Sequence, residues 1–139
     1  MKKFKFRLQQ VLEYRMMEEQ WAKEAFLTAR LATLECEGDI QDLITRRKEM
    51  LKQPVGDIHA HRAIERLLQK SDDDERAKHV ALEVLKDEEA AALEQWKFKR
   101  RELEVLKSLR EEAYAAWQKE SDHQEQAALD EWATTRRAA

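Results

Sequence analysis

Only one short stretch of this sequence of 139 residues can reverse a helical chain, and it lies at residues 53–57. Pro54 is the only proline, and Gly56 is one of two glycines. Proline lacks a backbone N–H and clashes with the preceding helical turn, whereas glycine enters the left-handed conformations that reversals use. The sequence therefore predicts an all-α fold, an antiparallel two-helix coiled-coil hairpin. We expect a single coiled-coil domain at 1–139, with helix 1 at about 4–53, a turn at 54–57 and helix 2 at about 58–136.

The composition favours extended helices over a compact core. Charged residues make up 40% of the sequence, against about 25% in typical soluble domains. Disorder is the alternative for such a sequence, but the near absence of proline and glycine and the regular apolar spacing argue against it. The net charge is −3, with 26 basic and 29 acidic residues. Since neither arm is a polycation, nucleic acid is not expected as a partner.

Apolar and small residues recur in both arms at alternating spacings of three and four, the heptad spacing of a helix laid along another helix. The predicted seam of the first arm is Leu8, Leu12, Arg15, Glu19, Ala22, Phe26, Ala29, Thr33, Cys36, Ile40, Leu43, Arg47 and Met50. That of the second arm is Ile64, Leu68, Ser71, Glu75, Lys78, Leu82, Leu85, Glu89, Ala92, Trp96, Lys99, Leu103, Leu106, Arg110, Ala113 and Trp117. Polar residues interrupt both seams, so we expect a pairing of modest stability. Cys36 is expected to be a small buried seam residue.

Three local features refine the hairpin. Asp57 is expected to cap the second helix by accepting a backbone N–H bond. Gly38 costs about 1 kcal/mol relative to alanine, but we expect the first helix to continue through it. The run from Ser71 to Glu75 is a candidate for a local interruption, because serine and aspartate compete with helical hydrogen bonds. The simpler interpretation of this run is a solvated helix face.

The bend lies off-centre, so the two arms differ in length. Pairing about Gly56 matches residues whose numbers add up to about 113, and the first arm, about 75 Å long, then ends near residue 110. About 28 residues of helix 2, about 40 Å, are left as a C-terminal overhang without an intramolecular partner. We expect this overhang to expose Tyr114, Trp117, Leu129 and Trp132, which suggests a docking surface.

No pattern of a catalytic, cofactor or metal site occurs in the sequence. His59 and His61 are two residues apart and would lie on different helix faces. The acidic run at 72–75 lacks the glycine and the ligand spacing of a calcium loop, and no phosphate loop, nucleophile elbow or zinc pattern is present. We therefore expect no enzyme activity, no cofactor and no metal.

The start of the chain is basic and could serve a partner. Lys2, Lys3, Lys5 and Arg7 precede any acidic residue, and cations at a helix N-terminus oppose the macrodipole, so this end either frays or uses its charge in binding. An anionic membrane is one possible surface for it; a protein partner is favoured, because acidic residues resume at Glu13. With no apolar run of about 20 residues and no signal-peptide core, we expect the cytoplasm.

The two ends of the chain carry further patterns. The opening segment is Phe4-Lys5-Phe6-Arg7-Leu8, followed by Val11-Leu12 and Arg15. The closing segment is Arg101-Glu102-Leu103-Glu104-Val105-Leu106-Lys107, then Arg110-Glu111, Glu125-Gln126 and Leu129-Asp130-Glu131 with Ala133 and Arg136. Both resemble the FliJ family, small coiled-coil proteins of the flagellar type III export apparatus. The resemblance covers essentially the whole chain, including its single bend.

This resemblance implies a stalk-like accessory component of flagellum biogenesis and motility, located at the cytoplasmic face of the inner membrane and associated with it through partners. The family is similar to the central stalk subunit of rotary ATPases. It is understood to insert into the hexameric ring of the export ATPase and to promote its assembly and activity. It also links that ring to the cytoplasmic domain of the membrane export gate and helps to cycle export chaperones.

The resemblance leads to two sets of predicted partner-binding residues. For the ATPase, at the end formed by the chain start and the overhang, they are Arg7, Leu8, Leu12, Arg15, Leu106, Arg110, Tyr114 and Trp117. For the export gate, near the bend and chosen from surface chemistry, they are Ile40, Leu43, Ile44, Arg47, Ile64, Leu67 and Leu68. Two alternatives stay open: the stalk protein of an injectisome secretion system, and a generic scaffold that self-associates through the overhang.

Overall fold

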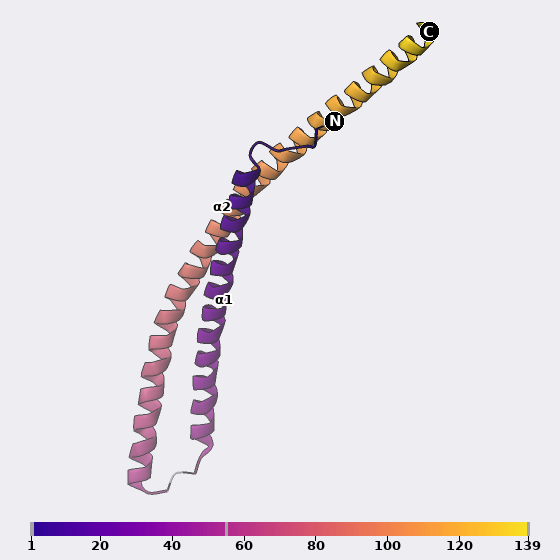
Figure 1. Cartoon of the computed structure of the whole chain (residues 1–139). Helices are drawn as coiled ribbons and strands as arrows, with labels where there is room; N and C mark the ends of the chain where they lie inside the picture. Colours follow the sequence, from indigo (N-terminus) through magenta and orange to yellow (C-terminus); the bar gives the residue numbers. More distant parts are fainter. Residues whose placement is uncertain (1, 55, 139) are drawn as a thin grey trace. The chain divides into compact units, whose positions relative to one another are not determined.

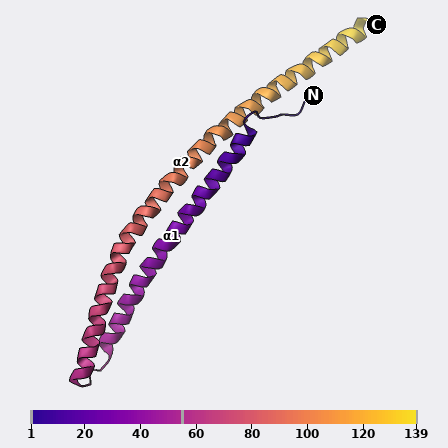
Figure 2. The same cartoon turned by 60° about the vertical axis from the view of Figure 1, so that its left-hand side comes forward.

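The computed structural model describes residues 2–54 and 56–138. These residues form two α-helices, α1 at Gln9–Lys52 and α2 at Ile58–Ala138, and no strand. The helices run antiparallel and side by side, which confirms the predicted all-α hairpin (Figures 1 and 2). The predicted turn includes Val55, which lies outside the described residues, as do the first and last residues of the expected domain.

The chain divides into two compact units, each built from part of α1 and part of α2. Unit 1 contains the residues up to Gln20 and those from Lys97 onward, and unit 2 is Trp21–Trp96. The apolar cluster of unit 1 consists of Leu12, Leu103 and Leu106, with Phe6 and Leu8 packed against it. That of unit 2 consists of Cys36, Ile40 and Leu82, with Ile44 and Leu85 packed against it. Cys36 is therefore buried, as predicted.

Burial follows the predicted seams. Every residue of the first seam is buried or half-buried, including the polar Arg15, Glu19 and Arg47. The same holds for every residue of the second seam except Arg110, which is exposed. Heptad spacing thus identified the face on which each helix packs, even at positions occupied by charged side chains.

The local predictions for the helices are confirmed in two of three cases. The Asp57 carboxylate accepts a hydrogen bond from the Ala60 backbone N–H at 2.8 Å, the predicted cap, and α1 continues through Gly38. Helix α2 also continues through the acidic run after Ser71, so the run is no interruption. The solvated-face interpretation is wrong for part of it, because Ser71 is buried and Glu75 is half-buried against α1, where it pairs with Arg47.

The first helix begins later than predicted, at Gln9 instead of about residue 4. Residues 2–6 have no regular secondary structure, and residues 7 and 8 form a turn into α1. Side-chain exposure alternates along these residues, and a period of two is that of an extended chain. The half-buried side chains are Phe4, Phe6 and Leu8, and the exposed ones are Lys3, Lys5 and Arg7. A helix here would place four cations at its positive end, whereas the extended segment turns them to solvent. We call residues 2–8 the N-terminal strap.

The strap shortens the overhang. The Phe4 ring contacts both Tyr114 and Trp117, so the prediction that these two residues lack an intramolecular partner is wrong. An extended residue spans about 3.3 Å, against about 1.5 Å in a helix, so the strap reaches farther along α2 than a helix would. The strap covers α2 as far as Trp117, and the overhang begins beyond this residue. Leu129 and Trp132 are exposed there, as predicted.

Candidate partner-binding surfaces

An aromatic cluster in unit 1 fixes the strap to α2. The Phe4 ring meets Tyr114 edge-on, with 5.2 Å between ring centroids, and lies tilted on Trp117 at 5.9 Å. The Arg110 guanidinium lies over the same ring at 5.5 Å. Such aromatic pairs contribute about 0.5–1.5 kcal/mol each beyond area burial. One side chain of the strap thus makes three contacts with one face of α2.

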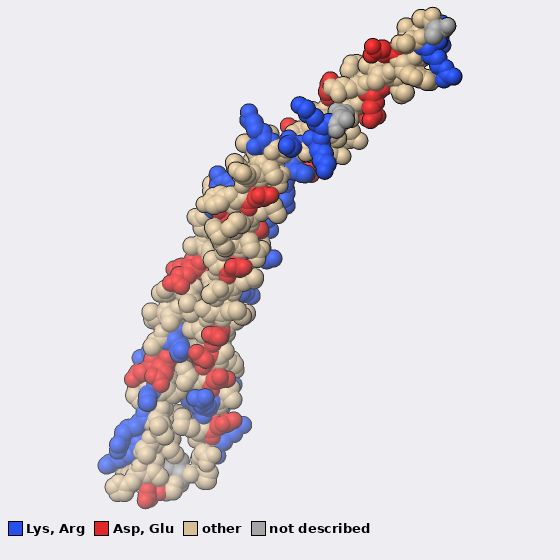
Figure 3. All heavy atoms as spheres, in the orientation of Figure 1, with Lys and Arg blue, Asp and Glu red and all other residues tan. Residues whose placement is uncertain are grey.

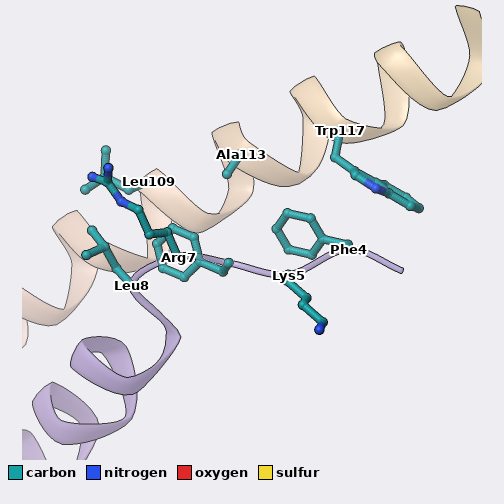
Figure 4. Close-up of a pocket in the computed structure, with 8 residues that line it drawn as sticks. Phe4, Lys5, Arg7, Leu8, Leu109, Ala113 and Trp117 are labelled. Atoms are coloured by element: carbon teal, nitrogen blue, oxygen red, sulfur yellow. The ribbon is translucent and has the colours of Figure 1, made fainter. Parts of the chain in front are cut away.

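A hollow of about 440 Å³ lies between the strap and α2. The strap lines it with Phe4, Lys5, Phe6, Arg7 and Leu8, and α2 lines it with Leu109, Ala113 and Trp117. In Figure 4 the Phe4 ring lies beside Trp117, whereas the Lys5 side chain points away from α2. The hollow is therefore apolar towards the helix, and the adjoining surface of the strap is basic.

Charged side chains join the two helices of unit 1 next to its apolar cluster. Lys99 Nζ lies 2.6 Å from a Glu18 carboxylate oxygen, and Arg15 bridges Glu102 at 3.0 Å and Glu18 at 3.2 Å. The hydrogen bond from Lys99 lowers the pKa of Glu18, and the same bond raises the pKa of Lys99. Two opposite pairs at one level of a coiled coil select the register of the helices.

The structure brings all eight residues predicted for ATPase binding into unit 1. Leu12 and Leu106 are buried in its cluster, and Leu8 and Arg15 are half-buried in contacts with other residues of the unit. Their side chains hold the unit together. The members that reach solvent most are Arg7, Arg110 and Tyr114, with Trp117 half-buried under Phe4.

All seven residues predicted for the export gate lie in unit 2. Ile40 is buried, and Ile44 packs against its cluster. Arg47 is engaged by two carboxylates of α2, Asp72 at 2.9 Å and Glu75 at 2.7 Å. Leu43, Ile64 and Leu68 are half-buried. Leu67 is the one member that is mostly exposed, at 52%.

In unit 2, small seam residues of α1 donate hydrogen bonds to main-chain oxygens of α2. Thr33 is only 1% exposed. Its hydroxyl donates to Ala29 O at 3.1 Å and to Leu85 O on α2 at 3.4 Å. The Cys36 thiol donates to Lys78 O at 3.5 Å. Lys78 in turn donates to Asp39, and this hydrogen bond raises the pKa of Lys78.

Two features of unit 1 escaped the sequence-based prediction. One is the non-helical conformation of the strap, whose basic residues were expected to bind a partner; the alternation of aromatic and basic residues was an available signal for this conformation. The other is a stripe of exposed apolar residues on α2, Phe98, Val105 and Leu109. Spacings of seven and four place these three on one flank of the helix, beside the seam. A second heptad pattern, offset from the first, was the signal for this stripe.

Histidine and acidic residues do not converge on a metal site in the part of the chain that the structure describes. His61 lies against the Glu65 carboxylate at 3.1 Å, one helical turn away.

No helix in the described ranges is both long enough and apolar enough to cross a membrane.

A comparison with protein families finds a match over nearly the whole chain. A family model described as the flagellar FliJ protein matches residues 4–138, which begin at Phe4 in the strap and include both helices. No curated protein and no solved structure matches the chain. The chain therefore belongs to the FliJ family, whose members are non-catalytic components of the flagellar export apparatus.

Proposed function

We propose that this protein is a stalk-like accessory component that binds the hexameric export ATPase through unit 1 and the membrane export gate through unit 2. In this role it promotes the activity of the ATPase ring, links the ring to the gate and helps to cycle export chaperones. It acts in the cytoplasm and reaches the inner membrane through its partners. The observation that carries the proposal is that the eight residues expected at the ring and the seven expected at the gate belong to different units.

The exposed side chains of unit 1 support a role in binding the ring. Arg7 and Arg110 reach solvent, and a guanidinium binds carboxylates in a bidentate manner with defined geometry. Tyr114 adds an aromatic surface with a polar tip, the kind of residue enriched in interfaces. The buried Leu12 and Leu106 act indirectly in this proposal, because they hold α1 and α2 at the spacing that presents these groups.

The apolar residues of unit 2 support a role in binding the gate. Leu67 is exposed, and Ile64 and Leu68, its neighbours on α2, are half-buried. An exposed leucine beside partly covered apolar side chains offers a small hydrophobic anchor, and such anchors carry much of the free energy of an interface. Leu67 is therefore the first residue to test on this side.

Substitutions of exposed residues test the two proposed binding roles, that of unit 1 for the ATPase and that of unit 2 for the gate. Arg110→Ala combined with Tyr114→Ala is expected to lower stimulation of the purified export ATPase, with helix content by circular dichroism unchanged. Leu67→Asp is expected to weaken capture by the purified cytoplasmic domain of the gate and to leave ATPase stimulation intact. Arg62→Ala, an exposed arginine of unit 2, is the matched control for the ATPase assay. Full stimulation by the double variant would remove unit 1 from the ring interface.

Self-association is a second candidate, favoured by one observation. Leu129 and Trp132 are 60% and 59% exposed on the overhang, and exposed large apolar residues mark interaction sites. A scaffold would form a dimer whose population rises with protein concentration, and Trp132→Ala would abolish it. Sedimentation velocity separates this function from that of a stalk, which requires a monomer.

A further inference from the structure

The strap carries a basic surface of unit 1. Three hollows border it, and no acidic residue lines any of them. Their basic lining residues are Lys2, Lys3, Lys5, Arg7 and Arg110. None of these cations forms an ion pair with another residue in the described ranges; the polar contact of Arg110 is with the neutral Gln9 side chain, 3.3 Å away. Figure 3 shows basic side chains gathered where the strap runs.

The backbone of the strap is also available for pairing. Phe6 O and Leu8 O accept hydrogen bonds from Gln9 N and Leu12 N, but the backbone groups of residues 2–5 bond to no other described residue. Extended backbone with free N–H and C=O groups is a template for an added strand. Lys3 and Lys5 lie on the exposed face of the strap, and alternate residues of a strand lie about 7 Å apart; the exposed Arg7 follows in the turn that leads into α1.

The apolar side chains of the strap are already engaged, which separates this surface from a membrane anchor. Phe4 is held between Tyr114 and Trp117, and Phe6 and Leu8 pack on the cluster of Leu12, Leu103 and Leu106. An amphipathic membrane-binding segment inserts such residues into the lipid interface. The docked strap exposes cationic side chains and main-chain N–H and C=O groups to solvent, and a polypeptide is the ligand that can bind to both.

We propose that the strap is a docking site for an acidic polypeptide segment that adds to it as a second β-strand. Carboxylates at every second position of that segment lie beside Lys3 and Lys5, since paired side chains on one face of two strands are about 5 Å apart, and the next carboxylate meets Arg7 in the turn that ends the strap. The intervening residues face α2 near Leu109 and Ala113, which favours small apolar side chains there. This inference goes beyond the ATPase assignment, with which it shares Arg7, because any protein with such a segment fits the site.

A peptide titration tests the proposal with the full-length protein. The probe is a fluorescein-labelled octapeptide of alternating glutamate and valine, and binding is read as fluorescence anisotropy. Three comparison peptides are used: one with the same residues in two blocks, one with lysine for glutamate, and one with proline for valine, which keeps the charges but loses backbone N–H groups. The alternating acidic peptide is expected to bind, with an affinity that falls as salt is added, and the other three are expected to bind weakly.

The variant Lys3→Gln, Lys5→Gln, Arg7→Gln is expected to weaken binding about tenfold, the product of three exposed charge pairs. Its control, Lys48→Gln, Lys52→Gln, Arg62→Gln, removes three exposed cations from unit 2 and leaves the affinity unchanged. The strap variant does not alter the helix content, because the strap is not helical; the control residues lie exposed on the helices, and circular dichroism checks that the helix content of the control is also unchanged. Equal binding of the triple strap variant, or of the block or proline peptide, overturns the proposal. Strap-dependent binding to anionic phospholipid vesicles without peptide binding also overturns it, in favour of a membrane. The double variant Lys3→Gln, Lys5→Gln keeps Arg7 and separates the two proposals: its loss of peptide binding with ATPase stimulation intact leaves the proposed function standing.

Discussion

Replacing Phe4 by alanine tests whether aromatic contacts hold the strap on α2. Phe4 makes two ring contacts, with Tyr114 and Trp117, each contributing about 0.5–1.5 kcal/mol. Its cation–π contact with Arg110 contributes about 0.5–1 kcal/mol at an exposed site. The variant therefore loses about 1.5–4 kcal/mol, which lowers the docking equilibrium about ten- to several hundredfold. Docking the strap also has to offset the cost of ordering its backbone, about 1–2 kcal/mol per residue. The loss of the Phe4 contacts is therefore large enough to release the strap.

The accessibility of Trp117 reports on strap release. Replacing Trp21, Trp96 and Trp132 by phenylalanine leaves Trp117 as the only tryptophan, and acrylamide quenching then measures its exposure. Phe4→Ala is expected to raise the quenching constant while circular dichroism stays constant, because Phe4 precedes α1. Phe98→Ala, which removes an exposed ring from α2, is the matched control and leaves quenching unchanged. Identical quenching in the Phe4 variant and its parent would refute the aromatic anchoring of the strap.

Three further predictions concern the helices. Gly38→Ala is expected to raise the free energy of unfolding by about 1 kcal/mol, because nothing lies within 4 Å of the added methyl group; a urea midpoint at or below that of the parent would contradict this. Asp57→Ala removes the cap on Ala60 N and is expected to cost about 0.5–2 kcal/mol, seen as faster hydrogen exchange in the first turn of α2; unchanged exchange would argue against the cap. The pKa of Glu18 lies below its ordinary value of 4.5 because Lys99 donates to its carboxylate. Its contribution to stability is present above the unfolded-state pKa and is lost as pH falls through the lower folded-state pKa. Thermal unfolding from about pH 7 to about pH 3 should therefore show a shallower loss of stability for Glu18→Gln than for its parent, and parallel curves would exclude this contribution.

The packing faces of both helices could be predicted from the sequence, because heptad spacing does not depend on each seam position being apolar. Arg47 and Glu75 were identified as seam residues although both are charged, and the structure pairs them across the helices. The partner of each charged residue could not be predicted in the same way. The register predicted by pairing residues about Gly56 was off by several residues. The length of the chain between the two helices does not reveal how many of its residues are used to cross from one helix to the other.

The strap could not be foreseen from helix propensity alone. Phe4, Lys5 and Phe6 are compatible with a helix by composition, and the heptad pattern extends back to Leu8. Tertiary contacts decide the conformation of this segment, because the extended form brings Phe4 to Tyr114 and Trp117. The exposure of the predicted partner-binding residues could be read in part from the seams, because Ile40 is a buried seam residue and Leu67 lies off the seam and reaches solvent. Arg110, a seam residue that is exposed, could not be foreseen in this way.

The bonds from Thr33 and Cys36 to main-chain oxygens of α2 have a consequence for how this sequence can vary. Every residue type has a backbone carbonyl, so the acceptor at positions 78 and 85 persists whatever side chain is substituted there. The two helices can therefore change independently at this level without losing the bond, provided that α1 keeps a small donor. At Arg47, by contrast, a change on either helix needs a matching change on the other, because both partners are side chains.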